Sequence, residues 1–582
     1  MPEQTLLSGR EKLEKRIRQA RGLEPADLVI RGAKIVNVLS REVLEGDVAV
    51  CDGVIIGIGS YEGREVSEVS GWLIPGMIDS HVHVESSMLT PQEFARIMVA
   101  RGVTSAIADP HEIMNVAGLD ALHFMQADAQ NAAMDLFFMM ASCVPATPFE
   151  HAGAVIESRD MRQDVLAHSV TGLGEMMNFP GLLSGDSAVL DKLLLAEQAG
   201  VIVDGHSPGL TGKDLCAYIA SGISTDHECS TVEEMTERIR LGMYVQLRYG
   251  SACTDLPVLV SGITPANASR CLLCSDDIQP LTICGRGALD AGVRYCISQG
   301  VDPMDAISMA TCNAAACYGL RDRGAIAPGR IADLVLVDDL QSFTVRKVWK
   351  SGILTAENGK CVLPVPAERQ PRQIGNMNVK DFREEKLRLH LASGTVHTIG
   401  IVPGGVLTED RIRQVRLDET GDFVYDSSQD VVRISVIERH HGTGNAGSAL
   451  LSDYGLKRGA IAVSVAHDSH NIIVAGTHTS DMYAAVQEII RMKGGMTAVL
   501  DGTVLASLPL PVGGLMSDRD APFVISRLQK LQQIAQDVLG VRRDIEPVMV
   551  LCFMALPVIP ELKLTDKGLF DVRTMQFIDG SK

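Results

Sequence analysis

The sequence predicts an α/β protein with a (β/α)8 barrel of the TIM type, a small flanking β-sandwich domain and an additional C-terminal α+β domain. Eight strand-like segments alternate with helical patterns across residues 76–325, which is a typical length for such a barrel. Two short all-β stretches flank that span at 25–75 and 326–370, and residues 371–582 follow with a third, strand-rich pattern. A chain of 582 residues also exceeds one ordinary hydrophobic core.

Residues 1–24 are charged and helical in pattern, without the apolar centre of a secretory signal. No apolar run is long enough to cross a bilayer, and the 13 cysteines are scattered, unlike a disulfide framework. The formal net charge of -19 argues against non-specific binding to nucleic acid. We therefore expect a cytoplasmic enzyme that acts on a small molecule, with no membrane or nucleic-acid partner.

The two flanking stretches share a pattern of short alternating strands with Gly and Asp turns. ADLVIRGAKIVNVLS and GDVAVCDGVIIGIGS lie in the first stretch, and GRIADLVLVDDL and VRKVWKSGILTAENGK lie in the second. This pattern predicts one small β domain built from both flanks of the barrel.

The barrel opens with WLIPGMIDSHVHVESSMLTP, residues 72–91. Its apolar strand ends in Asp79, His81 and His83, and residues two apart in a strand point to the same face. The two imidazoles therefore converge, and neutral imidazole is a common metal ligand. A pair of surface histidines is the alternative, but the preceding apolar strand favours a metal site.

The other predicted strands also end in polar residues, where a barrel of this type has its active site. They are GVTSAIADPHE with Asp109, His111 and Glu112; MDLFFMMASCVPAT; VTGLGEMMN with Glu175; VIVDGHS with His206; GISTDHE with His227; YVQLRYGSA with Arg248; and CLLCSDD with Asp276 and Asp277.

Six strand-end residues have metal-ligand chemistry: His81, His83, Glu175, His206, His227 and Asp276. A lone histidine is more often a core residue, and a lone glutamate is more often a surface group. Six of them at one end of a barrel favour a centre for two divalent cations. We predict one ion at His81, His83 and Asp276 and another at His206 and His227. Glu175 is the natural bridge, because its two oxygens can each face one ion.

The C-terminal domain carries a polar cluster after the strand AIAVSV, and two histidines after another strand. These residues are His467, Asp468, Ser469, His470 and Asn471, with His440 and His441. We favour a turn or a domain interface for them. The alternative is a lid that reaches the mouth of the barrel and excludes water from the reaction.

Other candidate features have ordinary explanations. Cys271 and Cys274 form a CxxC within an apolar run, which favours core thiols over a zinc site. Met176 and Met177 favour packing, and Arg248 fits either a substrate contact or an ion pair equally well.

The layout of these motifs resembles the amidohydrolase superfamily, with HxH after the first strand, histidines after the fifth and sixth, and aspartate after the eighth. Within it, the chain resembles the bacterial adenine deaminases in IDSHVHVESSMLTP, ADPHEI, GEMMNFPG, DGHSPG, STDHE, CSDD, AHDSHNIIVAGT and LPLPVGGLMSD. Many superfamily members bridge their metals with a carboxylated lysine, whereas GLGEMMNFPG offers Glu175 and no lysine. The resemblance implies hydrolysis of adenine to hypoxanthine and ammonia, in purine salvage.

In such a reaction a divalent cation lowers the pKa of its water to about 7, and Asp276 is placed to take the proton of the attacking water. Glu85 and Glu112 are the candidates for protonating the purine, and Asp109 and His111 are the candidates for binding it. The alternatives are that Glu85 supports a histidine ligand, that Asp109 and Glu112 cap a turn, and that His111 joins Asp109 in an additional metal site.

Two other functions remain open. The same site could act on an N6-substituted adenine or a cyclic amide, or the chain could be a catalytically silent, metal-stabilised binding or assembly protein. We expect manganese as the metal, with iron or zinc as alternatives because imidazole and carboxylate ligands do not choose between them. We also expect a homo-oligomer, a dimer.

Overall fold

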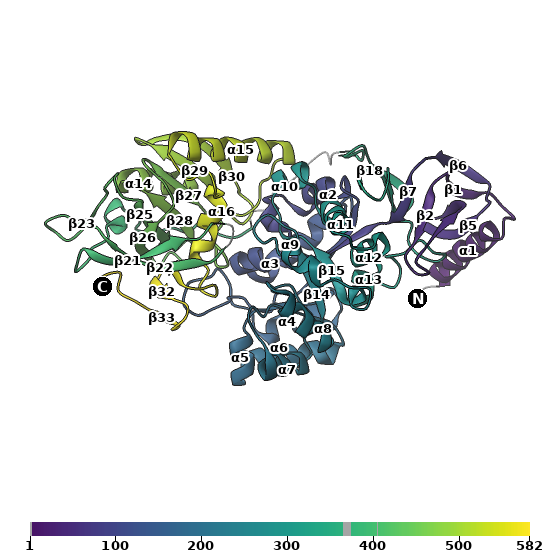
Figure 1. Ribbon diagram of the computed structural model, residues 1–582, viewed down its shortest axis with the longest axis horizontal. Helices are drawn as coiled ribbons and strands as arrows, with labels where there is room; N and C mark the ends of the chain where they lie inside the picture. Colours follow the sequence, from purple (N-terminus) through teal and green to yellow (C-terminus); the bar gives the residue numbers. More distant parts are fainter. Residues whose placement is uncertain (1–2, 365–373, 404–405) are drawn as a thin grey trace.

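The computed structural model describes residues 3–364, 374–403 and 406–582. Its elements form three parts along the long axis of the molecule: a β-rich part near the N-terminus, an α/β part in the middle and an α+β part at the other end (Figure 1). The predicted boundary between residues 370 and 371 lies outside the described residues, as do residues 1 and 2 of the predicted N-terminal helix. Within the described ranges, no helix combines the length and the apolar character needed to cross a membrane.

Two β-sheets make up the β-rich part. The first contains β5 (Val54–Gly59), β4 (Asp47–Cys51), β1 (Ala26–Arg31) and β6 (Gly63–Glu68), in that order. The second contains β20 (Lys360–Cys361), β19 (Ile353–Glu357), β18 (Val345–Lys350), β17 (Leu334–Val337), β7 (Trp72–Pro75), β2 (Lys34–Asn37) and β3 (Glu42–Glu45).

The second sheet joins the two flanks of the chain. β17 and β7 pair in antiparallel register, with Leu334 opposite Pro75. Apolar side chains from both sheets, such as Ile30 and Trp349, pack into one core. The helix α1 (Glu3–Ala20) ends at Ala20, which packs against a separate small cluster on the first sheet.

The middle part contains nine short strands that pair in parallel. They are β8 (Met77–His83), β9 (Val103–Ala108), β10 (Asp135–Phe138), β11 (Gly172–Met176), β12 (Ile202–Gly205), β13 (Thr225–Asp226), β14 (Tyr244–Arg248), β15 (Cys271–Cys274) and β16 (Asp276–Asp277). Three groups result, in the orders β10-β9-β8-β16, β11-β12 and β13-β14-β15. β8 and β9 are buried at every residue, as expected for parallel strands that are covered on both faces.

Helices follow these strands and connect them. They are α2 (Pro91–Val99), α3 (His111–Ala129), α4 (Ser158–Leu166), α5 (Phe179–Ser184), α6 (Ser187–Ala199), α7 (Gly212–Ala220), α8 (Val232–Arg240), α9 (Leu256–Leu259), α10 (Pro280–Gly285), α11 (Leu289–Ser298), α12 (Pro303–Met309) and α13 (Cys312–Cys317). α8 begins with a capping box, in which Thr231 Oγ1 accepts from the Glu234 N–H and the Glu234 carboxylate accepts from the Thr231 N–H. This cap fixes the start of α8 shortly after His227.

The C-terminal part is built on an eight-stranded sheet. In order, its strands are β22 (Thr408–Gln414), β21 (Thr395–Ile401), β26 (Ala446–Ser452), β25 (Val431–Ile437), β28 (Ile472–Gly476), β27 (Ala460–Val463), β29 (Gly495–Leu500) and β30 (Thr503–Pro509). Alternate residues of β27 face opposite sides. Ala460 and Ala462 pack with α14 (Thr479–Met492), whereas Ile461 and Val463 belong to the large core that includes α15 (Ala521–Gln533) and α16 (Pro547–Cys552).

Two small sheets complete the C-terminal part. One pairs β23 (Arg416–Leu417) with β24 (Phe423–Val424), and the other contains β31 (Leu562–Thr565), β32 (Gly568–Asp571) and β33 (Gln576–Phe577). The turn between β31 and β32 contacts the loop that follows β10. Thr565 Oγ1 donates to Phe149 O at 2.9 Å, and the Asp566 carboxylate accepts from the His151 N–H at 3.0 Å. These bonds hold the C-terminal part against the carboxyl ends of the middle strands.

Candidate metal centre and active site

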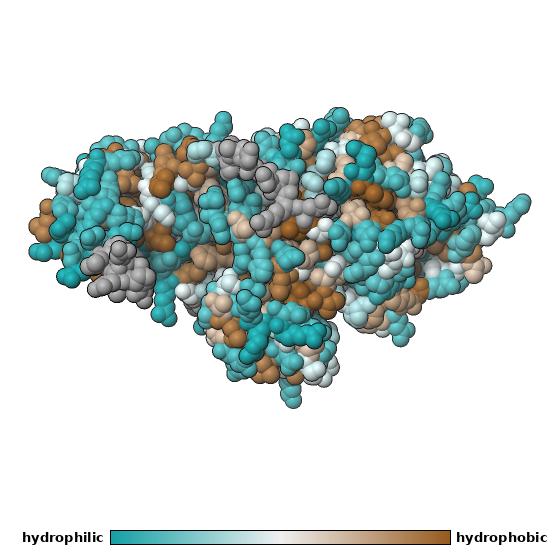
Figure 2. All heavy atoms as spheres, turned by 180° about the vertical axis from the view of Figure 1, so that it is seen from behind, coloured by the Kyte–Doolittle hydropathy of each residue, from teal (hydrophilic) through white to brown (hydrophobic). Residues whose placement is uncertain are grey.

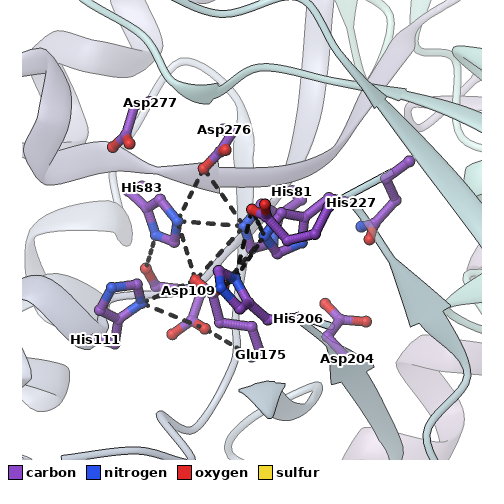
Figure 3. A network of polar contacts seen from close by, with 12 residues as sticks. His81, His83, Asp109, His111, Glu175, Asp204, His206, His227, Asp276 and Asp277 are labelled. Atoms are coloured by element: carbon purple, nitrogen blue, oxygen red, sulfur yellow. Dashed lines mark hydrogen bonds and ion pairs between the residues drawn. The ribbon is translucent and has the colours of Figure 1, made fainter. Parts of the chain in front are cut away.

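The six predicted metal-ligand residues lie together at the carboxyl ends of the parallel strands (Figure 3). His81 and His83 are in β8, Glu175 is in β11, Asp276 is in β16, and His206 and His227 directly follow β12 and β13. All are buried except His206, which is partly exposed. Because parallel strands bring their carboxyl ends to one side of a sheet, residues far apart in the chain meet here.

Glu175 lies between two pairs of histidines. Its Oε1 is 3.3 Å from His83 Nε2 and 3.9 Å from His81 Nε2. Its Oε2 is 2.7 Å from His206 Nδ1 and 3.1 Å from His227 Nε2. Each oxygen of this carboxylate therefore faces a different histidine pair, which is the arrangement that a bridging ligand needs.

Asp276 faces the first histidine pair. Its Oδ1 is 3.1 Å from His83 Nε2, and its Oδ2 accepts from Arg248 Nη1 at 3.2 Å. Burial alone would raise the pKa of Asp276, but the hydrogen bond with His83 and the charge of Arg248 hold it well below its ordinary value. Arg248 also pairs with Glu228 and with Asp255, so it is an ion-pairing residue in this structure.

The spacing of these donor atoms fits a metal ion. The Nε2 atoms of His81 and His83 are 3.2 Å apart, and His206 Nδ1 is 3.3 Å from His227 Nε2. Two ligand atoms bound to one ion at about 2.1 Å lie roughly 3.0–3.5 Å from each other. Burial lowers the pKa of His81 well below its ordinary value, so its ring is neutral and able to act as a ligand.

Hydrogen bonds behind the donors fix their orientation. His83 Nδ1 is 2.9 Å from Asp109 O, and a carbonyl oxygen can only accept, so Nδ1 carries a proton and Nε2 is the atom that would bind a metal. Asp109 Oδ2 accepts from the Glu175 N–H at 3.0 Å, and Ser142 Oγ donates to Glu175 O at 2.6 Å. Asp109 therefore positions Glu175, a predicted metal ligand. Ser142 also positions Glu175, and the sequence around Ser142 carries no motif that would have identified it.

His111, at the start of α3, lies between this centre and a second group of polar residues. Its Nδ1 is 3.3 Å from Glu175 Oε1 and 3.7 Å from Asp109 Oδ2. Its Nε2 is 3.4 Å from Glu112 Oε1. His111 thus borders the metal-ligand residues on one side and Glu112 on the other.

Glu112 lies between two histidines of the C-terminal part. Its Oε1 is 2.5 Å from His467 Nδ1, and its Oε2 hydrogen-bonds His470 Nε2. Glu85 Oε1 accepts from the Ile113 N–H at 3.1 Å, while its Oε2 has no hydrogen-bond partner among the described residues. The interpretation that Glu85 supports a histidine ligand finds no such contact in the structure.

A cavity separates the metal-ligand residues from the C-terminal part. His83, Glu175, His206 and Asp276 line it on one side. The C-terminal part lines the other side with His467, Asp468, Val406, Phe553, Leu556, Val558 and Ile559. The favoured interpretation of the polar cluster, a turn or an interface, is therefore incomplete, because two of its members reach the site as a lid would.

His441 has the interface contact that the sequence suggested, whereas the hydrogen bond of His440 lies within the C-terminal part. His440 Nε2 is 2.6 Å from Ser469 O, and His441 Nε2 is 2.7 Å from Ala152 O in the loop after β10. The lining residues Phe553, Val558 and Ile559 were not identified from the sequence, because apolar residues have the same sequence pattern whether they line a cavity or fill a core.

Comparison with known proteins gives matches along nearly the whole chain. The profile of the Amidohydrolase family matches residues 72–355, and that of the Adenine deaminase C-terminal domain matches residues 405–576. A protein named adenine deaminase 2 from Desulfotalea psychrophila is 50% identical over 570 residues, which cover 98% of this chain and 99% of that protein. An adenine deaminase from Clostridium acetobutylicum is 45% identical over 568 residues, which cover 97% of this chain and 100% of that protein. The resemblance read from the motifs is confirmed, and the chain belongs to the adenine deaminase family of the amidohydrolases.

Proposed function

We propose that this protein hydrolyses adenine to hypoxanthine and ammonia, in purine salvage. The observation that carries the proposal is the identity of about half the residues to proteins named adenine deaminase over nearly the full length of both chains. The geometry agrees with the chemistry, because imidazole and carboxylate groups converge on one buried cavity.

We infer that the middle part is a closed (β/α)8 barrel. Single parallel bridges from Met140 to Leu173 and from Val203 to Ile223 connect its three groups of strands. β16, one residue beyond β15, pairs with β8 and places Asp276 opposite Val82. These pairings support a ring of eight strands. The two sheets of the β-rich part support a β-sandwich domain made of 25–75 and 326–370, next to a barrel at 76–325.

We propose that the site holds two divalent cations, manganese in the first place and iron or zinc otherwise. His81, His83 and Asp276 would hold one, His206 and His227 the other, and Glu175 would bridge them. The fit rests on the donor spacing described above. When bound, such ions lower the pKa of a water from 15.7 to about 7, so that hydroxide is available at neutral pH.

The protein's own groups would move the protons. Asp276 would accept the proton of the attacking water, because Arg248 and His83 keep its carboxylate ionised. Glu112 and Glu85 are the proposed acids for the purine ring. Burial raises the pKa of Glu85 to about 7, so Glu85 can carry a proton near neutral pH. Glu112 lines the cavity, but the charges of His467 and His470 outweigh its burial and hold its pKa well below its ordinary value, so Glu85 is the favoured donor. His111 lines the same cavity and is a proposed substrate contact. Asp109 is proposed as a further one, and its Oδ1 has no hydrogen-bond partner among the described residues.

We further propose a cytoplasmic homodimer that binds a purine base and neither nucleic acid nor membrane. The net charge of -19 supports the exclusion of nucleic acid. A lobe that carries α5, α6 and α7 projects from the middle part (Figure 1). Its surface has hydrophobic residues among hydrophilic ones (Figure 2), which supports self-association. Leu183, Leu190 and Leu194 of α5 and α6 are exposed on this lobe.

The test is turnover by protein purified with manganese, whose metal content is measured on the same sample. We expect conversion of adenine to hypoxanthine, seen as ammonia release and a change in the ultraviolet spectrum, with adenosine untouched. Turnover of N6-methyladenine or dihydrouracil in place of adenine would move the assignment to the alternative substrates. No turnover of any of them by fully metallated protein would favour the silent assembly protein.

A further inference from the structure

The turn after β27 presents one buried carboxylate to the cavity without a partner. Asp468 is 3% exposed, and its Oδ2 has no hydrogen-bond partner among the described residues. The carboxylate lines the same cavity as His83, Glu175 and Asp276. A buried acceptor without a partner is unfavourable, so a ligand that donates a hydrogen bond to it binds more tightly than a ligand that does not.

The neighbours of Asp468 are held firmly. His467 and His470 both hydrogen-bond the Glu112 carboxylate. Asn471 Nδ2 donates to His151 O at 2.9 Å, and its Oδ1 accepts from the Arg439 N–H at 3.2 Å. Because these contacts fix the turn from both sides, the Asp468 side chain is held in place at the cavity.

The chemistry of Asp468 selects one kind of ligand group. Burial, and then the charge of Glu112, raises the pKa of Asp468 to about 6. At and above neutral pH the group is therefore a carboxylate, which can only accept hydrogen bonds. A free purine base carries one N–H on its imidazole ring, at N9 or N7, whereas a nucleoside carries ribose at N9 and has no such donor.

We propose that Asp468 of the C-terminal part accepts a hydrogen bond from the imidazole N–H of a free purine base and so selects bases over nucleosides. This proposal rests on the proposed function for the class of substrate. It gives the C-terminal part a role in specificity that the predicted metal-ligand residues do not have, since they are proposed to act at the amino-bearing carbon of the six-membered ring. A nucleoside would then be rejected because it cannot donate this hydrogen bond, in addition to any effect of the size of the cavity.

The test compares adenine with 9-methyladenine and 7-methyladenine, which lack the N–H, in wild type, Asp468→Asn and Asp468→Ala. A hydrogen bond to a charged group is worth about 10- to 100-fold in affinity. We expect Asp468→Ala to lower kcat/KM for adenine by that factor, mainly through KM, and to leave kcat/KM for the methylated bases unchanged or higher. Asp468→Asn keeps the volume of the side chain and should show a smaller loss of the same kind.

Asp501→Asn is the matched control, because Asp501 is an exposed aspartate of a turn in the same part of the chain. Metal content is measured for every variant, so that a loss of ions is not mistaken for a loss of recognition. An equal loss for adenine and both methylated bases, or no loss at all, would overturn the proposal.

Binding of the same three bases, measured by calorimetry, separates this proposal from the proposed function. If wild type does not turn over adenine, the proposed function fails while the binding comparison still decides the role of Asp468. Preference of wild type for adenine over both methylated bases, lost in Asp468→Ala, supports that role. The same preference in both proteins contradicts it.

Discussion

Two buried clusters of histidine and carboxylate lie next to each other in this molecule and differ in construction. The strand-end cluster comprises the six metal-ligand residues, and the interdomain cluster comprises Glu112, His467 and His470. In the strand-end cluster most neighbouring donor atoms are 3.1–3.3 Å apart. In the interdomain cluster Glu112 Oε1 is 2.5 Å from His467 Nδ1, and Glu112 Oε2 hydrogen-bonds His470 Nε2. Similar residue types are therefore arranged at different spacings in the two clusters.

The spacing explains the difference. A metal ion keeps its ligands roughly 3.0–3.5 Å apart, whereas a charge-assisted hydrogen bond brings its nitrogen and oxygen to about 2.7–2.9 Å. Most of the strand-end cluster has the spacing of metal ligands, with one hydrogen bond of 2.7 Å between Glu175 and His206, whereas both oxygens of Glu112 in the interdomain cluster are engaged in hydrogen bonds. The strand-end residues all belong to the middle part of the molecule. Glu112 and His467, by contrast, are 355 residues apart in the chain and come from two different parts, so they meet only when those parts pack together.

The largest effect that tests this comparison is expected for Asp276→Asn. The amide keeps the size of the side chain but is a much weaker proton acceptor, so turnover of adenine should fall by about 10³-fold or more. Metal content should stay close to that of wild type. Asp214→Asn, at an exposed position in α7, is the control. Near wild-type turnover by Asp276→Asn would remove Asp276 from proton transfer.

The next largest effect is expected for Glu175→Gln. An amide cannot offer two anionic oxygens, so one of the two proposed ions should bind about 10²-fold more weakly. Metal analysis after dialysis would show about one ion per chain lost, together with most of the turnover. Retention of both ions would show that Glu175 is not a bridge.

Much of the strand-end cluster could be predicted from the sequence for a physical reason. His81 and His83 follow an apolar strand at a spacing of two, and Glu175, His206, His227 and Asp276 each follow or end another predicted strand. Parallel strands place such ends side by side whatever the loops do. The order of strands was enough to bring these side chains together without any knowledge of the helices.

The interdomain cluster could not be predicted in the same way. No periodicity in the sequence relates the ADPHE turn to the AHDSHN turn, because the contact depends on how two separately folded parts dock. The role of Ser142 behind Glu175 is equally invisible, since a serine that donates to a main-chain carbonyl has no sequence signature. The boundary predicted at residues 370 and 371 falls outside the described part of the chain.

A smaller effect is expected for His470→Ala in the interdomain cluster. The change removes one buried hydrogen bond to Glu112 and should cost about 1–3 kcal/mol of unfolding free energy, with unchanged metal content. Turnover should fall only about tenfold, because the His467–Asp468 turn loses part of its support. Loss of metal in this variant would mean that the interdomain cluster also binds an ion.

The pH dependence of stability adds a second measurement on His470→Ala. Burial lowers the pKa of His470 from 6.5 to about 4, so the unfolded chain binds this proton more readily than the folded one. Wild type should therefore lose stability through His470 as the pH falls from about 6.5 towards 4. His470→Ala lacks that contribution, and its thermal unfolding should depend less on pH in the same range. Identical slopes would show that His470 does not titrate as its burial implies.

The smallest effect is expected for Lys563→Met. This variant tests the side of the cavity that the C-terminal part lines and leaves both clusters unchanged. Lys563 is fully buried, and its Nζ donates to Val406 O at 2.9 Å and Phe553 O at 3.0 Å. Val406 and Phe553 both line the cavity. Loss of these bonds should make that side of the cavity less ordered and raise KM for adenine a few-fold, without changing metal content. Lys530→Met, at an exposed position of α15, is the control.

The same variant has a pH signature of its own. Burial lowers the pKa of Lys563 from 10.5 to about 7, and a neutral amine still has the two N–H groups that two carbonyl acceptors require. Through this group the wild-type protein should lose stability as the pH falls from about 10.5 towards 7. Lys563→Met should lack that slope, whereas Lys530→Met should keep it. If the pH dependence of stability is lost as expected but KM for adenine does not change, Lys563 stabilises the C-terminal part without shaping the cavity. That side of the cavity would then be shaped by the packing of Phe553 and its neighbours alone.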